Sequence, residues 1–270
     1  MKKKIFALVT VLMLLVCSMA AAEIKVTKRD LGLNTTLDKN VNHILLLLQD
    51  GGKTDTLMLA SINSRTGRSV MTCIDPDLVV NVPEKGDVPL SDVYELGDKK
   101  SRGLLAARTV NSLFDLNVST YVALDMELLP EMVEVVGALN MQLTAEEAEA
   151  MGTWEGINEL TGDDVLKYVR LRLENDDPAR SRGYDALMQL LYQGMHSGDL
   201  MGLMGLGTKM LSAMDSNLNV MTAMTLAGAV QAGEDRREVS LPAAEQILTE
   251  EPLTANVDAM KESLHREIYE

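Results

Sequence analysis

Three apolar runs near the start of the chain predict strands. Residues 43–48 form an apolar run that is typical of a buried strand. Residues 56–62 predict a second strand after the turn at 51–52, and residues 69–74 a third after the turn at 65–67. Because only short turns separate these runs, we expect antiparallel hairpins.

The rest of the chain mixes helical periodicity with shorter apolar runs. A segment with three prolines, residues 75–97, is expected to be a loop with at most short strands. Later helices are predicted at 102–114, 129–139, 184–193 and 255–268, and further strands at 119–126 and 238–241. The chain shows no repeat and no linker. We therefore predict an α/β fold (mixed α+β), a single domain with a central mixed β-sheet flanked by helices and enclosing an apolar pocket.

The first residues are typical of an export signal. Three lysines precede an apolar run over residues 5–16, and Ala20 and Ala22 fit a cleavage pattern of small residues. Residues 1–22 are therefore a signal peptide or an N-terminal membrane anchor, residues 23–40 a tether, and residues 41–270 the folded domain. Cleavage would leave one cysteine, Cys73, and so no internal disulfide.

Composition narrows the classes of partner. The formal net charge of −15 over 270 residues disfavours nucleic acid and anionic lipid headgroups as bulk partners. Aromatic residues make up only 3% and methionines number 18, which indicates an aliphatic core that adapts in shape. Stacking platforms for sugars or bases are disfavoured by the same composition. The Met-, Leu- and Gly-rich residues 201–207 fit a lipid-accommodating pocket or, more simply, core packing.

Three arginines cluster within eleven residues of this acidic chain: Arg170, Arg172 and Arg180. A guanidinium offers a rigid fork of donors that matches phosphate oxygens, so the cluster suggests a specific anion site. The spacing of Thr161 and Asp164 is that of a capping box, which predicts a helix start. If that helix ends before Arg170, the arginines can converge. The simpler alternative, which spacing alone favours, is surface pairing with nearby acidic residues.

A second candidate site lies in the first predicted hairpin. Asp50 and Asp55 flank the glycine turn between two strands, where carboxylates can hold Mg²⁺. Lys53 and nearby backbone amides could meet a phosphate. A polar hairpin tip with two solvated acids is the commoner explanation. The three histidines are too dispersed for a metal cluster, and neither a nucleophile elbow nor a P-loop is present.

Taken in order, these segments resemble the LytR–CpsA–Psr family of cell-envelope proteins. The strand at 44–50 with its terminal Asp50 resembles the first core strand of the family. Residues 53–59 resemble its Arg-Ser-Asp-Thr-Met motif, and residues 160–172 its Leu-Asp-Gly-x-x-Ala-Leu-x-Tyr-Val-Arg-x-Arg motif. Arg180 matches the first arginine of its Asp-x-Gly-Arg-x-x-Arg-Gln element. The tail matches loosely at 215–219 and 240–242.

This resemblance implies a phosphotransferase of cell-wall assembly, at the outer face of the cytoplasmic membrane. Family members move a glycopolymer phosphate from a polyprenyl pyrophosphate carrier onto peptidoglycan, with Mg²⁺ bound by aspartates and the lipid tail in an apolar tunnel. The implied roles are metal binding by Asp50 and Asp55, charge neutralisation in transfer by Arg170, Arg172 and Arg180, and phosphate binding by Lys53 and Arg182, with Asp77 as a further matching acid.

Several departures from the family pattern remove positive charge. Pro76 stands where the family has arginine, and Pro89-Leu-Ser91 replaces Lys-Leu-Asn. Gly183 takes the place of the second arginine in the last motif, although Arg182 is adjacent. We therefore keep three hypotheses: an active transferase, a catalytically impaired member that binds polyprenyl phosphates or envelope polymers, and a structural envelope domain.

Overall fold

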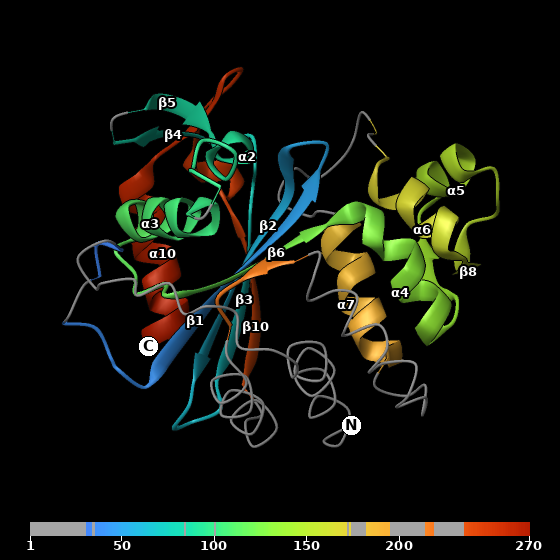
Figure 1. Cartoon of the computed structure of the whole chain (residues 1–270), viewed down its shortest axis with the longest axis horizontal. Coiled ribbons are helices and arrows are strands. Elements are labelled where there is room, and N and C mark those ends of the chain that lie inside the picture. Colours follow the sequence, from blue (N-terminus) through green and yellow to red (C-terminus); the bar gives the residue numbers. More distant parts are fainter. Residues whose placement is uncertain are drawn as a thin grey trace.

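A six-stranded mixed sheet with the strand order β10-β3-β2-β1-β6-β9 forms the centre of the molecule (Figure 1). The computed structural model describes residues 31–33, 36–83, 85–99, 101–171, 173, 182–194, 214–218 and 235–270. The strands are β1 (Val41–Asp50), β2 (Lys53–Asn63), β3 (Ser69–Ile74), β6 (Thr120–Asp125), β9 (Asp215–Ser216) and β10 (Arg236–Leu241). β2 pairs antiparallel with β1 and β3, whereas β6 pairs parallel with β1, and β10 with β3. The predicted mixed sheet is confirmed.

The hairpin of β1 and β2 departs from regular geometry at its tip. Gly51 and Gly52 form a two-residue turn, and both have positive φ, at 58° and 88°. A turn of this kind suits the twist of the flanking strands and favours glycine. The register then shifts, because Gln49 pairs with Thr54 but Leu48 pairs with Thr56. Asp55 is therefore the extra residue of a β-bulge, a feature that redirects side chains and is frequent next to active sites.

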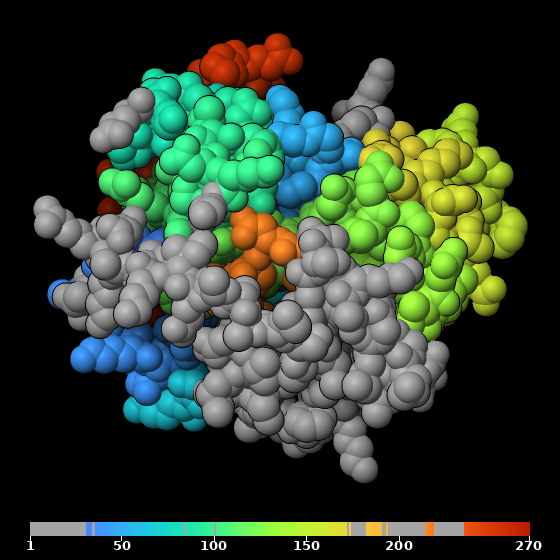
Figure 2. All heavy atoms as spheres, viewed as in Figure 1, coloured from blue at the N-terminus to red at the C-terminus, as the bar shows by residue number. Residues whose placement is uncertain are grey.

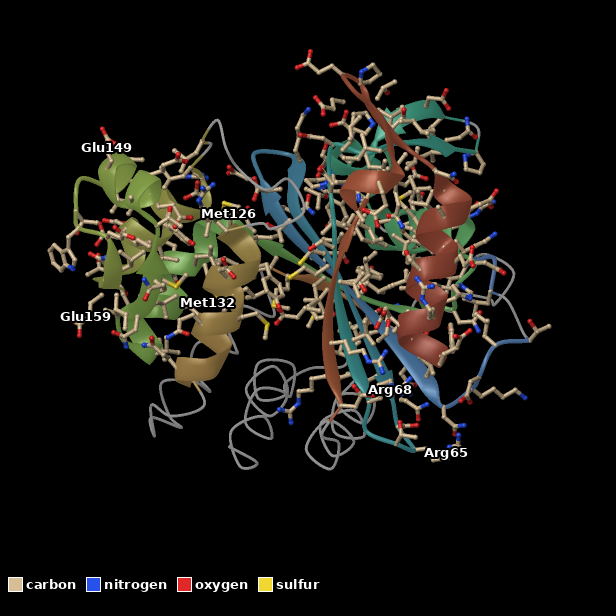
Figure 3. The ribbon with its side chains drawn as sticks, turned by 180° about the vertical axis from the view of Figure 1, so that it is seen from behind. Arg65, Arg68, Met126, Met132, Glu149 and Glu159 are labelled. Atoms are coloured by element: carbon tan, nitrogen blue, oxygen red, sulfur yellow. The ribbon has the colours of Figure 1, made fainter. Side chains whose placement is uncertain are left out.

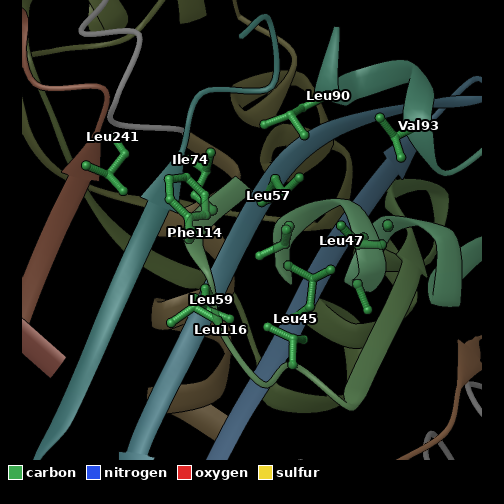
Figure 4. Close-up of a cluster of buried hydrophobic side chains, with 14 of the residues drawn as sticks. Leu45, Leu47, Leu57, Leu59, Ile74, Leu90, Val93, Phe114, Leu116 and Leu241 are labelled. Carbon is green, nitrogen blue, oxygen red and sulfur yellow. The ribbon is translucent and has the colours of Figure 1, made fainter. Parts of the chain in front are cut away.

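One face of the sheet packs on three helices, α2 (Leu90–Val93), α3 (Arg102–Phe114) and α10 (Val257–Tyr269). Leu45 and Leu47 of β1 point into this core with Phe114 of α3 (Figure 4). The approach of α3 to the sheet is close, since a Cβ added at Gly103 would lie 2.0 Å from the ring of Tyr121. Burial of these large apolar side chains is the main stabilising contribution on this side.

The other face carries a second core built from α4 (Leu129–Val136), α5 (Ala145–Met151), α6 (Gly162–Val169), α7 (Arg182–Gly194) and the hairpin of β7 (Leu139–Leu143) and β8 (Gly156–Leu160). Leu48 and Met58 face it from the sheet. Met126 and Met132 are fully buried between the sheet and these helices (Figure 3). Methionine fills an irregular core with few aromatic residues, as the composition predicted.

The predicted elements are found in the structure, but one helix is shorter and several further elements were not predicted. The helix expected at 129–139 ends earlier, at Val136, because Gly137 has a φ of 91° and turns the chain into β7. Neither the hairpin of β7 and β8 nor α5 was predicted. The segment 75–97 contains two short strands, β4 (Val79–Val82) and β5 (Gly86–Pro89), as the prediction allowed, and the unpredicted short helix α2. The remaining elements are η1 (Met126–Leu128), η2 (Ala244–Gln246), β11 (Ile247–Glu250) and β12 (Leu253–Ala255).

The predicted export signal at 1–22, most of the tether and the segment 201–207 lie outside the described residues. Within the described part of the chain, no helix combines the length and apolar character that crossing a bilayer requires. Cys73 is buried in the sheet, as expected of a structural thiol.

Candidate functional site

The candidate site lies where two parallel strands end side by side. Gln49 of β1 is in register with Asp125 of β6, so both strands reach their carboxyl ends at the same edge. This edge is the usual ligand position in sheets with parallel strands. Asp50 ends β1. Asp125 ends β6, and its Oδ1 accepts a hydrogen bond from the backbone N–H of Glu127 at 3.0 Å. Carboxylates from two strands therefore meet here.

Arg170 joins these carboxylates. Its Nε donates to Asp50 Oδ2 at 3.0 Å, and its Nη2 donates to Asp50 Oδ1 at 2.5 Å and to Glu127 Oε1 at 2.6 Å. The hydrogen bonds that Arg170 donates to Asp50 and then to Glu127 raise the pKa of Arg170 above its ordinary value. Its side chain is 36% exposed, so the guanidinium is both fixed and accessible. Nη1 has no partner within the described residues and can offer two N–H donors to an anion.

The helix α6 places Arg170 at this edge. Its N-terminus carries the predicted capping box, in which Asp164 Oδ2 accepts from Thr161 N at 3.2 Å and from Thr161 Oγ1 at 2.6 Å. Val165 and Val169 anchor the helix in the core. The helix ends at Val169 with Arg170 as its C-cap, which meets the condition for convergence set out above, and a cation is favoured at that end.

Asp55 lies in the bulge beside the hairpin tip. The hydroxyl of Thr56 donates to Asp55 Oδ2 at 3.1 Å. Within the described residues, no group of three His, Cys, Asp or Glu side chains is placed to hold a metal ion. Mg²⁺ usually takes only one or two carboxylates together with water and substrate phosphates. A Mg²⁺ site at Asp50 and Asp55 stays a prediction, because both carboxylate oxygens of Asp50 already accept hydrogen bonds from Arg170.

Two predicted phosphate-binding side chains have carboxylate partners. Lys53 Nζ lies 3.3 Å from Asp92 Oδ1 on α2, and the lysine side chain is largely exposed. Arg182 is only 11% exposed, and its Nε donates to Glu147 Oε1 at 2.9 Å. Its Nη1 donates to the carbonyl of Leu171 at 3.2 Å. Arg182 thus ties α7 to α5, and a phosphate role for either side chain requires its ion pair to open.

The remaining predicted residues are spread around this edge or are not described. Asp77 is exposed, and its backbone N–H donates to Asp75 Oδ1 at 2.9 Å. Arg172 and Arg180 lie outside the described residues. The structure therefore brings Asp50 and Arg170 together, which surface pairing with neighbouring acids would not require.

Sequence reasoning missed Glu127, the second carboxylate on Arg170. In the sequence, Glu127 directly follows the predicted strand at 119–126. Only the parallel pairing of β6 with β1 shows that this strand end lies next to Asp50. Asp215 of β9 was noted only as part of a loose tail motif. Its two oxygens accept from the hydroxyls of Tyr94 and Tyr121, each at 3.0 Å. Burial, followed by the charge of Asp215, raises the pKa of both tyrosines.

The sequence of this chain is similar to those of known cell-wall transferases. A polyisoprenyl-teichoic acid–peptidoglycan teichoic acid transferase, TagU, of Oceanobacillus iheyensis is 30% identical over 150 residues. The match covers 51% of this chain and 46% of that protein, so the chain spans about half the length of that relative.

Solved structures share the fold. TagT bound to LI-WTA superposes with a TM-score of 0.64 at 19% identity, over 86% of this chain and 93% of that chain. TagT with bound octaprenyl pyrophosphate lipid gives a TM-score of 0.58 at 17% identity, over 86% and 92%. The family model described as the LytR_cpsA_psr family matches residues 21–258. With nearly the whole described fold inside that match, the chain belongs to the LytR–CpsA–Psr family.

Proposed function

We propose that this chain is an extracytoplasmic phosphotransferase that moves a glycopolymer from a polyprenyl pyrophosphate carrier onto peptidoglycan. The observation that carries the proposal is the guanidinium of Arg170, which Asp50 and Glu127 fix at the carboxyl ends of β1 and β6. The name of the TagU relative and the octaprenyl pyrophosphate on TagT support the choice of reaction and carrier. The predicted leader at 1–22 fits a position near the membrane.

In this reaction an acceptor hydroxyl oxygen bonds to the phosphorus next to the glycan and loses its proton. The bond from that phosphorus to the bridging oxygen breaks, and polyprenyl phosphate leaves. Nη1 of Arg170 is positioned to donate to a phosphate oxygen as negative charge develops. Mg²⁺, when bound by Asp50 and Asp55, would supply further positive charge to the pyrophosphate. Arg172 and Arg180 are proposed to contribute in the same way.

A binding protein without turnover is the second candidate. The ion pairs of Lys53 with Asp92 and of Arg182 with Glu147 favour it, because both cations are already partly neutralised. Pro76 and Gly183 remove further positive charge relative to the family pattern. A lost donor to the transition state costs about 10²–10³ in rate.

One experiment separates the two candidates. The full chain is incubated with Mg²⁺, a polyprenyl-pyrophosphate-linked glycan and peptidoglycan, and both the product and the lipid affinity are measured. A transferase forms product, and Arg170→Ala reduces its rate at least about 10²-fold. A binding protein forms no product, yet Arg170→Ala weakens its affinity for the lipid. Arg65→Ala, an exposed arginine in the turn between β2 and β3, is the matched control and should change neither. If the wild type forms no product and does not bind the lipid, both candidates are rejected.

A further inference from the structure

One segment of the chain carries most of its net negative charge. Residues 125–166, which we name the acidic lobe, contain eleven Asp and Glu residues and no Lys, Arg or His. The whole chain has a net charge of −15, so the other 228 residues together contribute only −4. The lobe comprises η1, α4, β7, α5, β8 and the first part of α6, and it forms one end of the molecule (Figure 2).

Most of these carboxylates face the solvent. The exposed acidic residues of the lobe are Asp125, Glu127, Glu131, Glu134, Glu146, Glu149, Glu155, Glu159 and Asp163. Glu149 and Glu159 lie at this end of the molecule, far from Arg65 and Arg68 at the end of the β2–β3 hairpin (Figure 3). Such an asymmetric distribution creates a strong local potential that attracts cations and repels anionic polymers.

The same lobe exposes two large apolar side chains. Trp154 and Ile157 are each 67% exposed. Trp154 is the only tryptophan in the chain, and it lies on the connection from α5 to β8. Ile157 pairs with Gln142 on the outer face of the β7–β8 hairpin. An aromatic ring held in water is characteristic of interface residues.

The turn that carries Trp154 is rigid. The buried amide of Asn158 donates to the carbonyl of Trp154 at 2.8 Å and to that of Gly156 at 3.0 Å. Its Oδ1 accepts from the hydroxyl of Thr153 at 2.7 Å. The backbone that carries the ring is therefore ordered before a partner binds, so less backbone freedom would be lost on binding.

We propose that the acidic lobe is a docking surface for a cationic protein segment that carries Lys or Arg around an apolar side chain. Charge complementarity selects this partner, since the carboxylates attract its cations and repel anionic polymers and lipids. Trp154 and Ile157 supply the exposed apolar contact within the lobe. Glu127 binds Arg170 and is not counted in this docking surface, which does not require transferase activity.

The single tryptophan gives a direct test. Two short peptides of equal charge, one alternating Lys with Leu and one alternating Lys with Ser, are titrated into the full chain. The expected result is a saturable 1:1 blue shift of Trp154 emission with the Lys–Leu peptide and affinity about tenfold weaker for the Lys–Ser peptide. Added salt should weaken both. Ile157→Ser should remove most of the difference in affinity between the two peptides. The double change Glu155→Gln with Glu159→Gln should weaken the affinity for both peptides.

Leu248→Ser is the matched control, because Leu248 is equally exposed, at 67%, but lies on β11 outside the lobe. It should leave both affinities unchanged, and circular dichroism should show that every variant is folded. Equal affinity for the two peptides, or a shift without saturation, would overturn the proposal in favour of unspecific polycation binding. A blue shift with an uncharged chitooligosaccharide and none with the Lys–Leu peptide would instead identify a glycan surface.

Discussion

At the scale of single residues, the position of Arg170 depends on two carboxylates with different surroundings. Asp50 binds it through two hydrogen bonds and is mostly shielded, whereas Glu127 binds it through one and is 63% exposed. Together the two carboxylates accept from Nε and Nη2 and leave Nη1 without a partner among the described residues. The orientation of Arg170 therefore depends in part on Glu127, which no motif identifies.

We expect Glu127→Gln to weaken the affinity for a polyprenyl pyrophosphate several-fold, because the guanidinium of Arg170 loses one of its two anchors. The free energy of unfolding should change by less than about 1 kcal/mol, since the pair is half exposed. Isothermal titration and urea unfolding measure the two effects. Glu134→Gln, an exposed glutamate of α4, is the control. An unchanged affinity in Glu127→Gln would show that Asp50 alone orients Arg170.

A buried histidine gives the fold a dependence on pH. His43 Nδ1 lies 2.9 Å from Ser61 Oγ, and Nε2 lies 3.3 Å from the hydroxyl of Tyr269 on α10. Burial, and then the charge of His265, lowers the pKa of His43 to about 4. Between pH 6.5 and about 4, His43 is therefore protonated in the unfolded chain but neutral in the folded protein. Stability from this group is complete above pH 6.5 and is lost as the pH falls from 6.5 towards 4.

Denaturant unfolding at pH 7.5 and pH 5 measures this loss. The wild type should lose about 2 kcal/mol more than His43→Gln between the two values, because the amide cannot be protonated. Other titrating groups are common to both proteins and cancel in the comparison. Equal losses in the two proteins would show that His43 is protonated in the folded state.

At the scale of elements, sequence patterns predicted those strands and helices that have one buried face or a local stop signal. The helix at 102–114 and the strand at 69–74 were predicted at their observed bounds, and the capping box marked the start of α6. The β7–β8 hairpin was missed although β7 alternates buried and exposed residues, because each strand has only five residues and α5 separates the two in sequence. Nor could any local pattern show that Arg170 meets Asp50, since 120 positions separate them.

The contact of α3 with the sheet depends on one glycine. We expect Gly103→Ala to destabilise the fold by about 1–3 kcal/mol, because the new Cβ would meet the buried ring of Tyr121 at 2.0 Å. Helix propensity alone would predict a gain of up to about 1 kcal/mol. Ser112→Ala, at an exposed position of the same helix, should be neutral or slightly stabilising. Thermal unfolding measures the stability of both variants relative to the wild type. A Gly103→Ala variant more stable than the wild type would contradict the tight packing.

At the scale of the whole molecule, the last described segment completes the sheet. β10 pairs parallel with β3, and Arg68 forms an ion pair with Asp235, 167 positions away in sequence. α10 covers the core next to these strands. The two ends of the described domain therefore contribute to one structure.

Removing residues 235–270 should abolish cooperative unfolding and cause aggregation. The truncation exposes the edge of β3 and the apolar core under α10, and an unpaired edge invites pairing between chains. Size-exclusion chromatography and urea unfolding, compared with the full chain, test this expectation. A monomeric truncated protein that still unfolds cooperatively would show that β10 and α10 are accessory.

The pairing of β10 with β3 also bears on how the chain is made. Residues that meet across this ladder are separated by most of the domain, which gives the fold a high contact order and a slow final step. Until the last segment has been synthesised, β3 has no neighbour on that side and the core beneath α10 is open. During synthesis the edge of β3 and the open core can therefore pair with other chains. A chaperone that covers strand edges would have its largest effect in this period.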